Sequence, residues 1–288
     1  MSFHKAALSI AWITVEGPPM NRICCFLMTR LTIVAMVFCL QTGADGADPL
    51  RLRVLCYNIH HAEGVDGRLD VARIADVVRS VDPDLVALQE VDQNVKRTKV
   101  VDQPAELGRL ANLQVVFGGN IELQGGRYGN AVLSRFPIVQ HRNHLLPNID
   151  NSEQRGVLEA EIRIPGTNKP LLLLATHLDF RTDQRERLAS AEVINKLMAA
   201  RPDQAALLAG DLNATPDSST LQLLEKVWVR ANATPMATVP VDRPQQQIDF
   251  ILYHPRDRWR VVEFKVLDEP IASDHRAIFA VLELAGAG

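Results

Sequence analysis

The sequence predicts an α+β domain in which strands outnumber helices. After residue 50, most apolar runs are only about four to seven residues long and rich in Val, Ile and Leu, and Gly, Pro, Asn or Asp separates them. Such short runs between turn residues are typical of buried strands. Three longer segments show the spacing of amphipathic helices. The turn sequence Pro165-Gly166-Thr167-Asn168 lies between two further apolar runs, which indicates a hairpin of residues 155–164 and 169–177.

Capping residues and apolar spacing predict the three helices. Asp70 can cap a helix whose apolar residues at 71, 74, 77 and 78 share one face, and this helix should end before Asp82-Pro83. A second helix is predicted from about residue 182 to 200, because its apolar residues form one broad side and Pro202 follows its end. A shorter helix is predicted over residues 218–227.

Six predicted strand ends carry polar side chains of the kind that hold metals or move protons. Each segment places one or two such residues against an apolar run: Tyr57-Asn58, Gln89-Glu90, Thr176-His177, Gly210-Asp211-Leu212-Asn213, Asp249-Phe250 and Ser273-Asp274-His275. A single polar residue at a strand end is usually a turn or capping residue. Chance would have to supply the pattern six times, so the set as a whole favours a functional site.

These residue types suit the cleavage of a phosphate ester. Such a reaction needs a cation to neutralise the anionic oxygens, a group to orient or deprotonate water, and donors for the developing charge. Hard cations such as Mg²⁺ prefer carboxylate oxygens together with water and phosphate. Glu90, at the end of the strand over residues 85–88, is the first candidate for a metal ligand.

The same segments, in the same order, resemble the endonuclease/exonuclease/phosphatase superfamily. That superfamily includes pancreatic deoxyribonuclease, abasic-site endonucleases, neutral sphingomyelinases and inositol polyphosphate 5-phosphatases. The resemblance runs from about residue 51 to the end and also includes Gly129-Asn130-Ala131-Val132-Leu133-Ser134. It implies a four-layer α/β/β/α sandwich, in which two mostly antiparallel sheets are flanked by helices and the active site lies at one end.

The resemblance implies that Glu90 binds a metal ion with Asn58 and Asp274 beside it. Mg²⁺ is the predicted ion, and Mn²⁺ is the alternative, because both accept an oxygen-rich site. Arg155 matches a position where many relatives place an arginine near the substrate. Its guanidinium could bind phosphate through two nitrogens, although a surface arginine is an equal alternative. Asn130 is predicted near the substrate on a scaffold strand that lines the cleft.

The catalytic roles implied by the resemblance fall on five residues. Asp211 and Asn213 would position the attacking water and the phosphoryl oxygens, and His177 would donate to the phosphate. Asp249 would hold the ring of His275 and favour its protonated form, which could stabilise the transition state. Either Asp211 or the Asp249–His275 pair could activate the water, and the sequence leaves this choice open.

Residues 1–47 are predicted to form a signal peptide with an upstream extension, and Met20 could be the true start. Two arginines precede an apolar run over residues 31–40, and Thr42-Gly43-Ala44 offers small residues for cleavage. An uncleaved membrane anchor is the alternative. Export to the periplasm or the medium is therefore predicted. The enzyme domain, residues 48–288, retains only Cys56, so no intramolecular disulfide is expected.

Charge and motif content narrow the substrate only in part. Without residues 1–47, the chain has 28 basic and 32 acidic residues, which does not favour tight nonspecific binding to nucleic acid. The loop Lys96-Arg97-Thr98-Lys99, with Arg127, could still form a local basic patch, or it could be an ordinary solvated loop. Leu208-Ala209 stand directly before Gly210, where inositol 5-phosphatases have a tryptophan, so that subclass is disfavoured. Neither Trp228 nor Trp259 lies in an obvious apolar loop such as a secreted sphingomyelinase would need.

The sequence therefore predicts an exported, Mg²⁺-dependent phosphoesterase, in first place a phosphodiesterase or nuclease. One alternative is an enzyme that acts on phospholipid or phosphoinositide headgroups. Another is a non-catalytic scaffold that binds a phosphorylated ligand in the same cleft. No stable protein partner is implied, and the oligomeric state is not predicted.

Overall fold

Two six-stranded sheets form the centre of the protein. The computed structural model describes residues 50–285. The first sheet contains β1 (Leu50–Asn58), β2 (Leu85–Gln93), β3 (Gln114–Leu123), β4 (Gly126–Ser134), β11 (Trp259–Val266) and β12 (Ile278–Leu284). The second contains β5 (Ile138–Leu145), β6 (Gly156–Ile162), β7 (Leu171–His177), β8 (Ala206–Asp211), β9 (Val229–Arg230) and β10 (Asp249–His254).

Both sheets are mixed, and most of their strand pairs are antiparallel. The strand order is β11-β12-β1-β2-β4-β3 in the first sheet and β5-β6-β7-β8-β10-β9 in the second. The parallel pairs are β1 with β2 and β7 with β8. A parallel pair needs a long crossover connection. The crossovers contain α2 (Val71–Ser80) and α4 (Arg185–Ala199), respectively.

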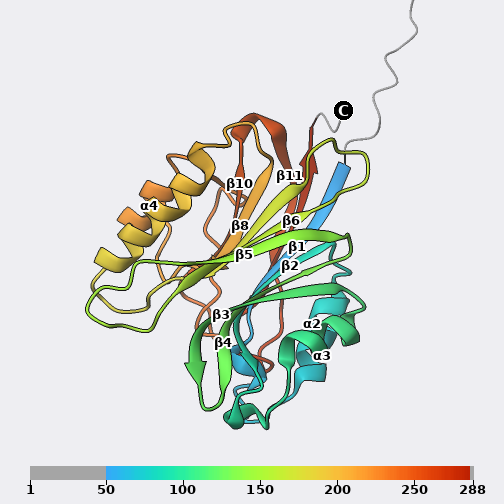
Figure 1. Cartoon of the computed structure of the whole chain (residues 1–288), viewed down its shortest axis with the longest axis vertical. Helices are drawn as coiled ribbons and strands as arrows, with labels where there is room; N and C mark the ends of the chain where they lie inside the picture. The colour runs from blue at the N-terminus through green and yellow to red at the C-terminus, as the bar shows by residue number, and fades with distance from the viewer. Residues whose placement is uncertain (1–49, 286–288) are drawn as a thin grey trace, which may run out of the picture. The chain divides into compact units, whose positions relative to one another are not determined.

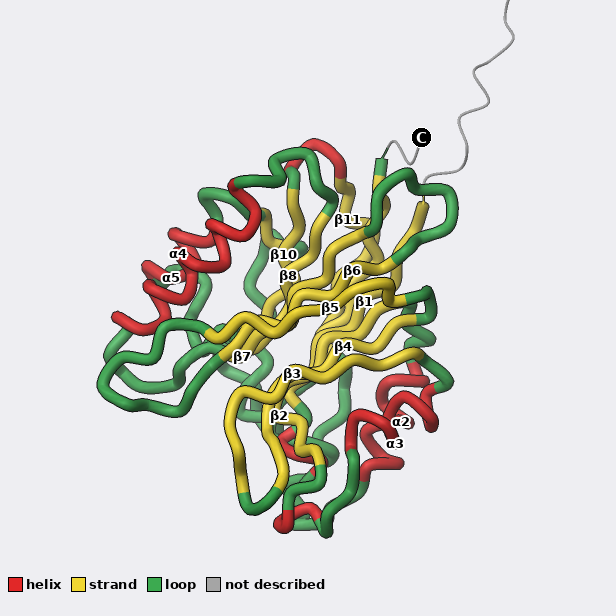
Figure 2. Tube along the Cα trace, viewed as in Figure 1, coloured by secondary structure: helices red, strands yellow, loops and turns green. Residues whose placement is uncertain are grey.

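Helices cover the outer faces of the two sheets, so the domain has four layers (Figures 1 and 2). α2 and α3 (Gln103–Ala111) lie against the first sheet, and α4 and α5 (Ser219–Leu224) lie against the second. The predicted α/β/β/α sandwich is confirmed. Among residues 50–285, no helix combines the length and the apolar character needed to cross a bilayer.

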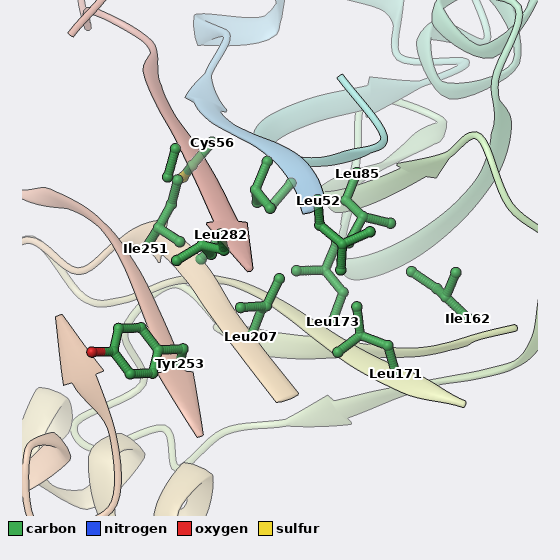
Figure 3. Close-up of a cluster of buried hydrophobic side chains, with 14 of the residues drawn as sticks. Leu52, Cys56, Leu85, Ile162, Leu171, Leu173, Leu207, Ile251, Tyr253 and Leu282 are labelled. Carbon is green, nitrogen blue, oxygen red and sulfur yellow. The ribbon is translucent and has the colours of Figure 1, made fainter. Parts of the chain in front are cut away.

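Three hydrophobic cores separate the four layers. Along β1, Leu52, Val54 and Cys56 pack between the sheets, whereas Leu55 and Tyr57 pack against the helices. Alternate residues of a strand point to opposite faces, so a strand buried on both sides must be apolar throughout. Figure 3 shows the core between the sheets, to which both contribute. The uninterrupted apolar runs of the sequence reflect this double burial.

The predicted elements are present with small differences at their ends. Asp70 caps α2, and its carboxylate accepts a hydrogen bond from the backbone NH of Arg73 at 2.9 Å. The second predicted helix begins at Arg185, three residues late, because Asp183 accepts a hydrogen bond from the Arg185 NH in a local turn. The third predicted helix is α5, which Ser218 caps and which ends at Leu224, three residues before the predicted end. The hairpin of β6 and β7 is confirmed, with Ile162 opposite Leu171.

The sequence analysis missed α3, although its capping signals are clear in retrospect. Asp102 accepts a hydrogen bond from the Ala105 NH, Pro104 lies in the first turn, and Asn112 ends the helix with a φ of 55°. Its apolar residues are few, so the helical spacing is weak over nine residues. The predicted signal peptide lies outside the described residues, and Cys56 is buried and unpaired.

Candidate active site

The strand register places three of the predicted catalytic residues in one row across the second sheet. His177 of β7 pairs with Asp211 of β8, and Asp211 pairs with Asp249 of β10. Residues directly opposite each other on neighbouring strands point to the same side of a sheet. His177 Nε2 accordingly lies 3.4 Å from Asp211 Oδ2. The row lies at the end of the strands, where the apolar runs stop.

The first sheet contributes Asn58 from the end of β1 and Glu90 from within the neighbouring parallel strand β2. The pairing of β2 with β4 shifts between Leu88 and Val91, and Glu90 within this bulge has a φ of 60°. A bulge re-aims the side chain that it carries, so Glu90 is partly exposed although both of its neighbours are buried. Asn58 Nδ2 donates to Glu90 Oε1 at 2.9 Å and to Asp211 Oδ2 at 3.1 Å. This buried amide therefore links the carboxylates of the two sheets.

His275 and Asp249 form a buried hydrogen-bonded pair. Nδ1 of the ring lies 2.9 Å from Asp249 Oδ2, and Nε2 lies 3.6 Å from Asp211 Oδ2. Burial alone lowers the pKa of His275, but the charge and the hydrogen bond of Asp249 outweigh it and raise the pKa from 6.5 to about 10. His275 is therefore an imidazolium at neutral pH. Its backbone NH is held by the hydroxyl of Ser273, which in turn donates to the Asn58 carbonyl.

Asp211 is the carboxylate at the centre of the arrangement. Oδ1 accepts the backbone NH of Asn213 at 2.9 Å, and Oδ2 accepts the amide of Asn58 and faces both imidazoles. Burial, and after it the charge of Asp249, raise the pKa of Asp211 from 3.8 to about 7, against the lowering effect of His275. A carboxylate with such a pKa can accept a proton near neutral pH.

Arg155 fixes the protonation state of His177. Its Nη1 lies 3.2 Å from His177 Nδ1 and 2.7 Å from Glu153 Oε1. Because a guanidinium only donates, Nδ1 must accept, and the ring proton is on Nε2. Burial, and after it the charges of Arg155 and His275, lower the pKa of His177 well below 6.5. His177 is thus a neutral ring with its proton on Nε2, the ring nitrogen that lies 3.4 Å from Asp211 Oδ2.

These residues border a cavity of about 210 Å³ at the end of the sandwich. Its lining comprises Glu90, Tyr128, Glu153, Arg155, His177, Phe180, Asp211, Asn213 and His275. The sequence analysis missed Tyr128, Glu153 and Phe180, since none of them belongs to a motif that it used. Phe180, three residues after His177, is 67% exposed. The exposure of Phe180 beside a polar cavity marks it as a candidate substrate contact, and this exposure can be seen only in the structure.

Two groups of side chains among residues 50–285 could hold a metal ion. Asp211, Asp249 and His275 form one group, and His60, His61 and Glu90 form the other. Within each group, the candidate ligand atoms all lie within 4.8 Å of one another. His60 and His61 belong to a short 3-10 turn (His60–Ala62) directly after β1. The sequence analysis did not single out these two histidines.

The remaining predicted site residues lie in different surroundings. Asn213 lines the cavity and donates from Nδ2 to the Leu178 carbonyl at 3.0 Å. Asn130 is buried and donates to the Gly156 carbonyl of the other sheet at 3.1 Å, and it does not line the cavity. Asp274 is exposed and belongs to neither metal-holding group, and its carboxylate accepts from the Ser273 hydroxyl at 3.3 Å. The role of Asp274 as a metal ligand stays a prediction.

The basic loop at residues 96–99 is in part a structural element. Arg97 donates from Nε and Nη2 to the two oxygens of the buried Asp92 at 2.8 and 2.9 Å, and its guanidinium lies over the Tyr128 ring. Arg127 donates to Gln93. Only Lys96 and Lys99 of this loop remain as exposed cations without such a contact among the described residues. The loop therefore offers less positive charge than its sequence suggests.

Comparison with known proteins gives consistent matches. The model of the endonuclease/exonuclease/phosphatase family matches residues 55–275. The chain is 32% identical to YbhP of Escherichia coli, a protein described as uncharacterized, over 222 residues that cover 72% of this chain and 86% of YbhP.

Solved structures of similar proteins share the fold. An endonuclease/exonuclease/phosphatase protein of Beutenbergia cavernae is 27% identical with a TM-score of 0.70, and the match covers 82% of this chain and 72% of that one. A mannosyl-6-phosphatase of Bacteroides thetaiotaomicron is 19% identical with a TM-score of 0.64, over 80% of this chain and 99% of that one. The second likeness concerns the fold alone.

Proposed function

The chain belongs to the endonuclease/exonuclease/phosphatase family, and on that premise we propose that it is a divalent-metal-dependent phosphodiesterase that cleaves nucleic acid. Members of the family are typically metal-dependent phosphoesterases, and the buried Asp211, Asp249 and His275 form a plausible active site. We further propose that residues 1–47 direct export. The observation that carries the catalytic proposal is the geometry of the three central groups: Asp211 Oδ2 lies 3.4 Å from His177 Nε2 and 3.6 Å from His275 Nε2, and Asp249 holds the other nitrogen of the His275 ring. The direction of their pKa shifts supports different roles for them.

Asp211 is the group that activates the attacking water. His275 cannot serve as the base because its pKa of about 10 leaves a proton on both ring nitrogens at neutral pH. His177 cannot serve either, because its Nδ1 accepts from Arg155 and its Nε2 carries the proton. Asp211 lines the cavity, its Oδ2 lies 3.4 Å from His177 Nε2 and 3.6 Å from His275 Nε2, and its pKa of about 7 suits proton transfer near neutral pH.

The two imidazoles supply donors for the phosphate oxygens. His275, charged and held by Asp249, stabilises the negative charge that develops in the transition state. His177 donates from Nε2, and Arg155 maintains that tautomer rather than contacting the phosphate itself. Preorganised donors of this kind contribute most when they are buried and fixed before the substrate binds, as these are.

A divalent cation fits the carboxylate that faces the cavity. Glu90 offers a partly exposed carboxylate, and Asn58 holds it in place from the side of Asp211. Mg²⁺ or Mn²⁺ would be bound by Glu90, with Asp274 as a candidate second ligand. When bound, the ion neutralises phosphate oxygens and lowers the pKa of its water.

Hydrolysis by the purified chain tests the function. The panel contains single- and double-stranded DNA, RNA, sphingomyelin, phosphatidylinositol phosphates and bis-p-nitrophenyl phosphate, each with Mg²⁺, Mn²⁺ or EDTA. We expect metal-dependent cleavage of nucleic acid that EDTA and His275→Ala abolish. Cleavage of a lipid headgroup alone would instead support the phospholipid alternative, although both Trp228 and Trp259 are buried and cannot insert into a bilayer. Binding without turnover on every substrate would support the non-catalytic scaffold.

Replacing Phe180 should weaken substrate binding without slowing the chemical step. Its ring is exposed at the edge of the cavity and provides a surface on which a nucleobase can stack. We expect Phe180→Ala to raise KM for single-stranded DNA roughly five- to tenfold, with kcat little changed, because the ring does not touch the reacting atoms. The measurement is steady-state kinetics on an oligonucleotide and on its abasic counterpart.

The abasic oligonucleotide should show no change, because it has no bases to stack. The control variant is Leu145→Ala, which removes another exposed apolar side chain outside the cavity lining. An equal rise of KM on both oligonucleotides would rule out stacking on Phe180.

A further inference from the structure

His60, His61 and Glu90 form a cluster that the proposed reaction does not fully use. One nitrogen of each ring and one oxygen of Glu90 lie within 4.8 Å of one another. The two rings meet edge to face, with their centroids 4.5 Å apart. Both histidines follow β1, whereas Glu90 lies in the bulge of the neighbouring parallel strand β2. The topology therefore brings two imidazoles beside the carboxylate proposed to hold the metal.

Four residues at this cluster have positive φ values, which non-glycine residues adopt only when their surroundings hold them there. His60, His61 and Ala62 have φ values of 45°, 43° and 62°, and Glu90 has 60°. Non-glycine residues with positive φ are uncommon and tend to occur at functional sites. Gln103, buried at the start of α3, donates to the His61 carbonyl at 2.7 Å and accepts the Asp92 NH at 3.0 Å. The turn is thus fixed to the helix and to β2.

The hydrogen bonds leave one nitrogen of each ring free to bind a metal. His60 Nδ1 lies 3.0 Å from the Glu63 carbonyl, which can only accept, so Nδ1 has the proton and Nε2 has the lone pair. His61 Nε2 lies 3.5 Å from the Glu63 carboxylate, while its buried Nδ1 has no hydrogen-bond partner. Glu63 therefore faces one nitrogen of each ring, as carbonyl and carboxylate partners of metal-binding histidines commonly do.

We propose that His60, His61 and Glu90 together bind one divalent first-row transition-metal ion, of the class of Mn²⁺, Co²⁺ and Zn²⁺. Two imidazole nitrogens and one carboxylate form a donor set that suits these ions, whereas Mg²⁺ strongly prefers oxygen ligands. The buried Nδ1 of His61 gains the partner that it otherwise lacks. The positive charge of nearby Arg97 is balanced by its two hydrogen bonds to buried Asp92. The inference rests on the proposed function in one respect, since both assign the ion to Glu90.

Binding of Co²⁺ to the metal-stripped full-length chain tests the site directly. Nitrogen ligation of Co²⁺ gives a visible absorption band whose growth during titration reports affinity and stoichiometry. We expect one equivalent to bind, and about a hundredfold excess of Mg²⁺ to leave the band in place. His60→Asn and His61→Asn should each weaken Co²⁺ binding at least tenfold, about the loss seen when even an outer-sphere partner is removed. Asparagine tolerates positive φ, so the turn should persist in both variants.

His144→Asn is the matched control. His144 also lies beside a carboxylate, with Nε2 3.2 Å from Glu159 Oε2, but it lies on β5, away from the cluster. Its Co²⁺ affinity should equal that of the original chain. Wild-type affinity in a His60→Asn/His61→Asn double variant would overturn the proposal, as would displacement of Co²⁺ by equimolar Mg²⁺. Thermal unfolding of each metal-free variant confirms that it folds. The rise in its unfolding temperature when Zn²⁺ is added gives a second measure of binding.

The two proposals can fail separately. If the metal inference is wrong, the double variant keeps both Co²⁺ binding and hydrolysis. If the proposed function is wrong, no substrate is cleaved with any ion, yet Co²⁺ still gives a band that the two histidine substitutions remove.

Discussion

Asp211→Asn should reduce hydrolysis between about a hundredfold and ten thousandfold, the contribution that a positioned general base typically makes. The amide keeps the shape of the carboxylate but cannot take a proton from water. The loss should appear in kcat at saturating substrate and metal. Asp217→Asn, an exposed aspartate in the same segment, should leave kcat unchanged. If Asp211→Asn kept more than a tenth of the turnover, another group would have to be the base.

The same substitution should change how stability depends on pH. The pKa of Asp211 is about 7 in the folded protein against 3.8 ordinarily, so the folded state holds this proton more tightly. Stability from this group is therefore lost as pH rises from about 4 toward 7. Between pH 4 and 6.5 the loss amounts to roughly 3 kcal/mol, at 1.36 kcal/mol per pKa unit. Asp211→Asn should remove this slope in EDTA.

Denaturant unfolding of both chains at pH 4 and pH 6.5 measures the difference. The NH₂ group of the new asparagine would also face hydrogen-bond donors that now donate to the Asp211 carboxylate. This lowers the stability of the variant by the same amount at both pH values, so it does not affect the difference between them. His275 contributes little in this window, because its ring stays protonated in the folded state and, with an ordinary pKa of 6.5, is still half protonated in the unfolded state at pH 6.5. Parallel slopes in the two proteins would show that Asp211 titrates normally.

Asp249→Asn should move the alkaline limit of activity to lower pH. The amide oxygen can still accept from His275 Nδ1, and its NH₂ group would lie where the buried Asp249 Oδ1 has no partner. The variant loses the largest of the charges that raise the pKa of His275 to about 10, so burial lowers that pKa against only the charges of Asp211 and Asp274. The ring should therefore lose its proton at a lower pH than in the original chain, and activity at pH 8.5 should fall by up to roughly a hundredfold, the effect of removing one transition-state donor. The deficit should shrink at pH 6.

The pH profile of kcat, together with an NMR titration of the His275 ring, measures this shift. In the original chain, the stability that the charged ring contributes is complete below pH 6.5 and is lost as pH rises through about 10. The control is Glu159→Gln, which removes the buried carboxylate beside the partly exposed His144. It should leave the activity profile unchanged. An Asp249→Asn enzyme with an unchanged alkaline limb would show that the charge of His275 is not needed.

Several parts of the fold were predictable because they depend on local patterns. The runs that became β1, β7 and β8 are apolar on both faces, since each lies between two cores, and this continuity is visible in the sequence. The caps of α2 and α5, Asp70 and Ser218, act within three residues of themselves. By contrast, α3 has a short apolar face. It is positioned in part by Gln103, whose hydrogen-bond partners Asp92 and His61 lie 11 and 42 positions earlier in the chain.

The candidate site shows the same division. Asn58, His177, Asp211 and Asp249 stand at strand ends, and the order of the strands brings these ends together. Glu90 lies within β2, where the predicted strand over residues 85–88 continues to Gln93. The outward turn of Glu90 was not predictable, because it depends on a bulge against β4. The sequence suggested that Arg97 could bind a substrate phosphate. In the structure its guanidinium is bound to the buried Asp92, and the burial of Asp92 cannot be inferred from the spacing of residues in the sequence.

The sequence by itself predicted the candidate site residues and the buried runs of the chain, because side-chain type and strand periodicity are local properties. Only the tertiary structure decided their protonation and their partners. Asn58 meets Asp211 across 153 positions of sequence, and His275 meets Asp249 across 26. The proton on His177, the charge of His275 and the pairing of His60 and His61 with Glu90 all follow from burial and from contacts between distant segments, which arise only when the two sheets pack together.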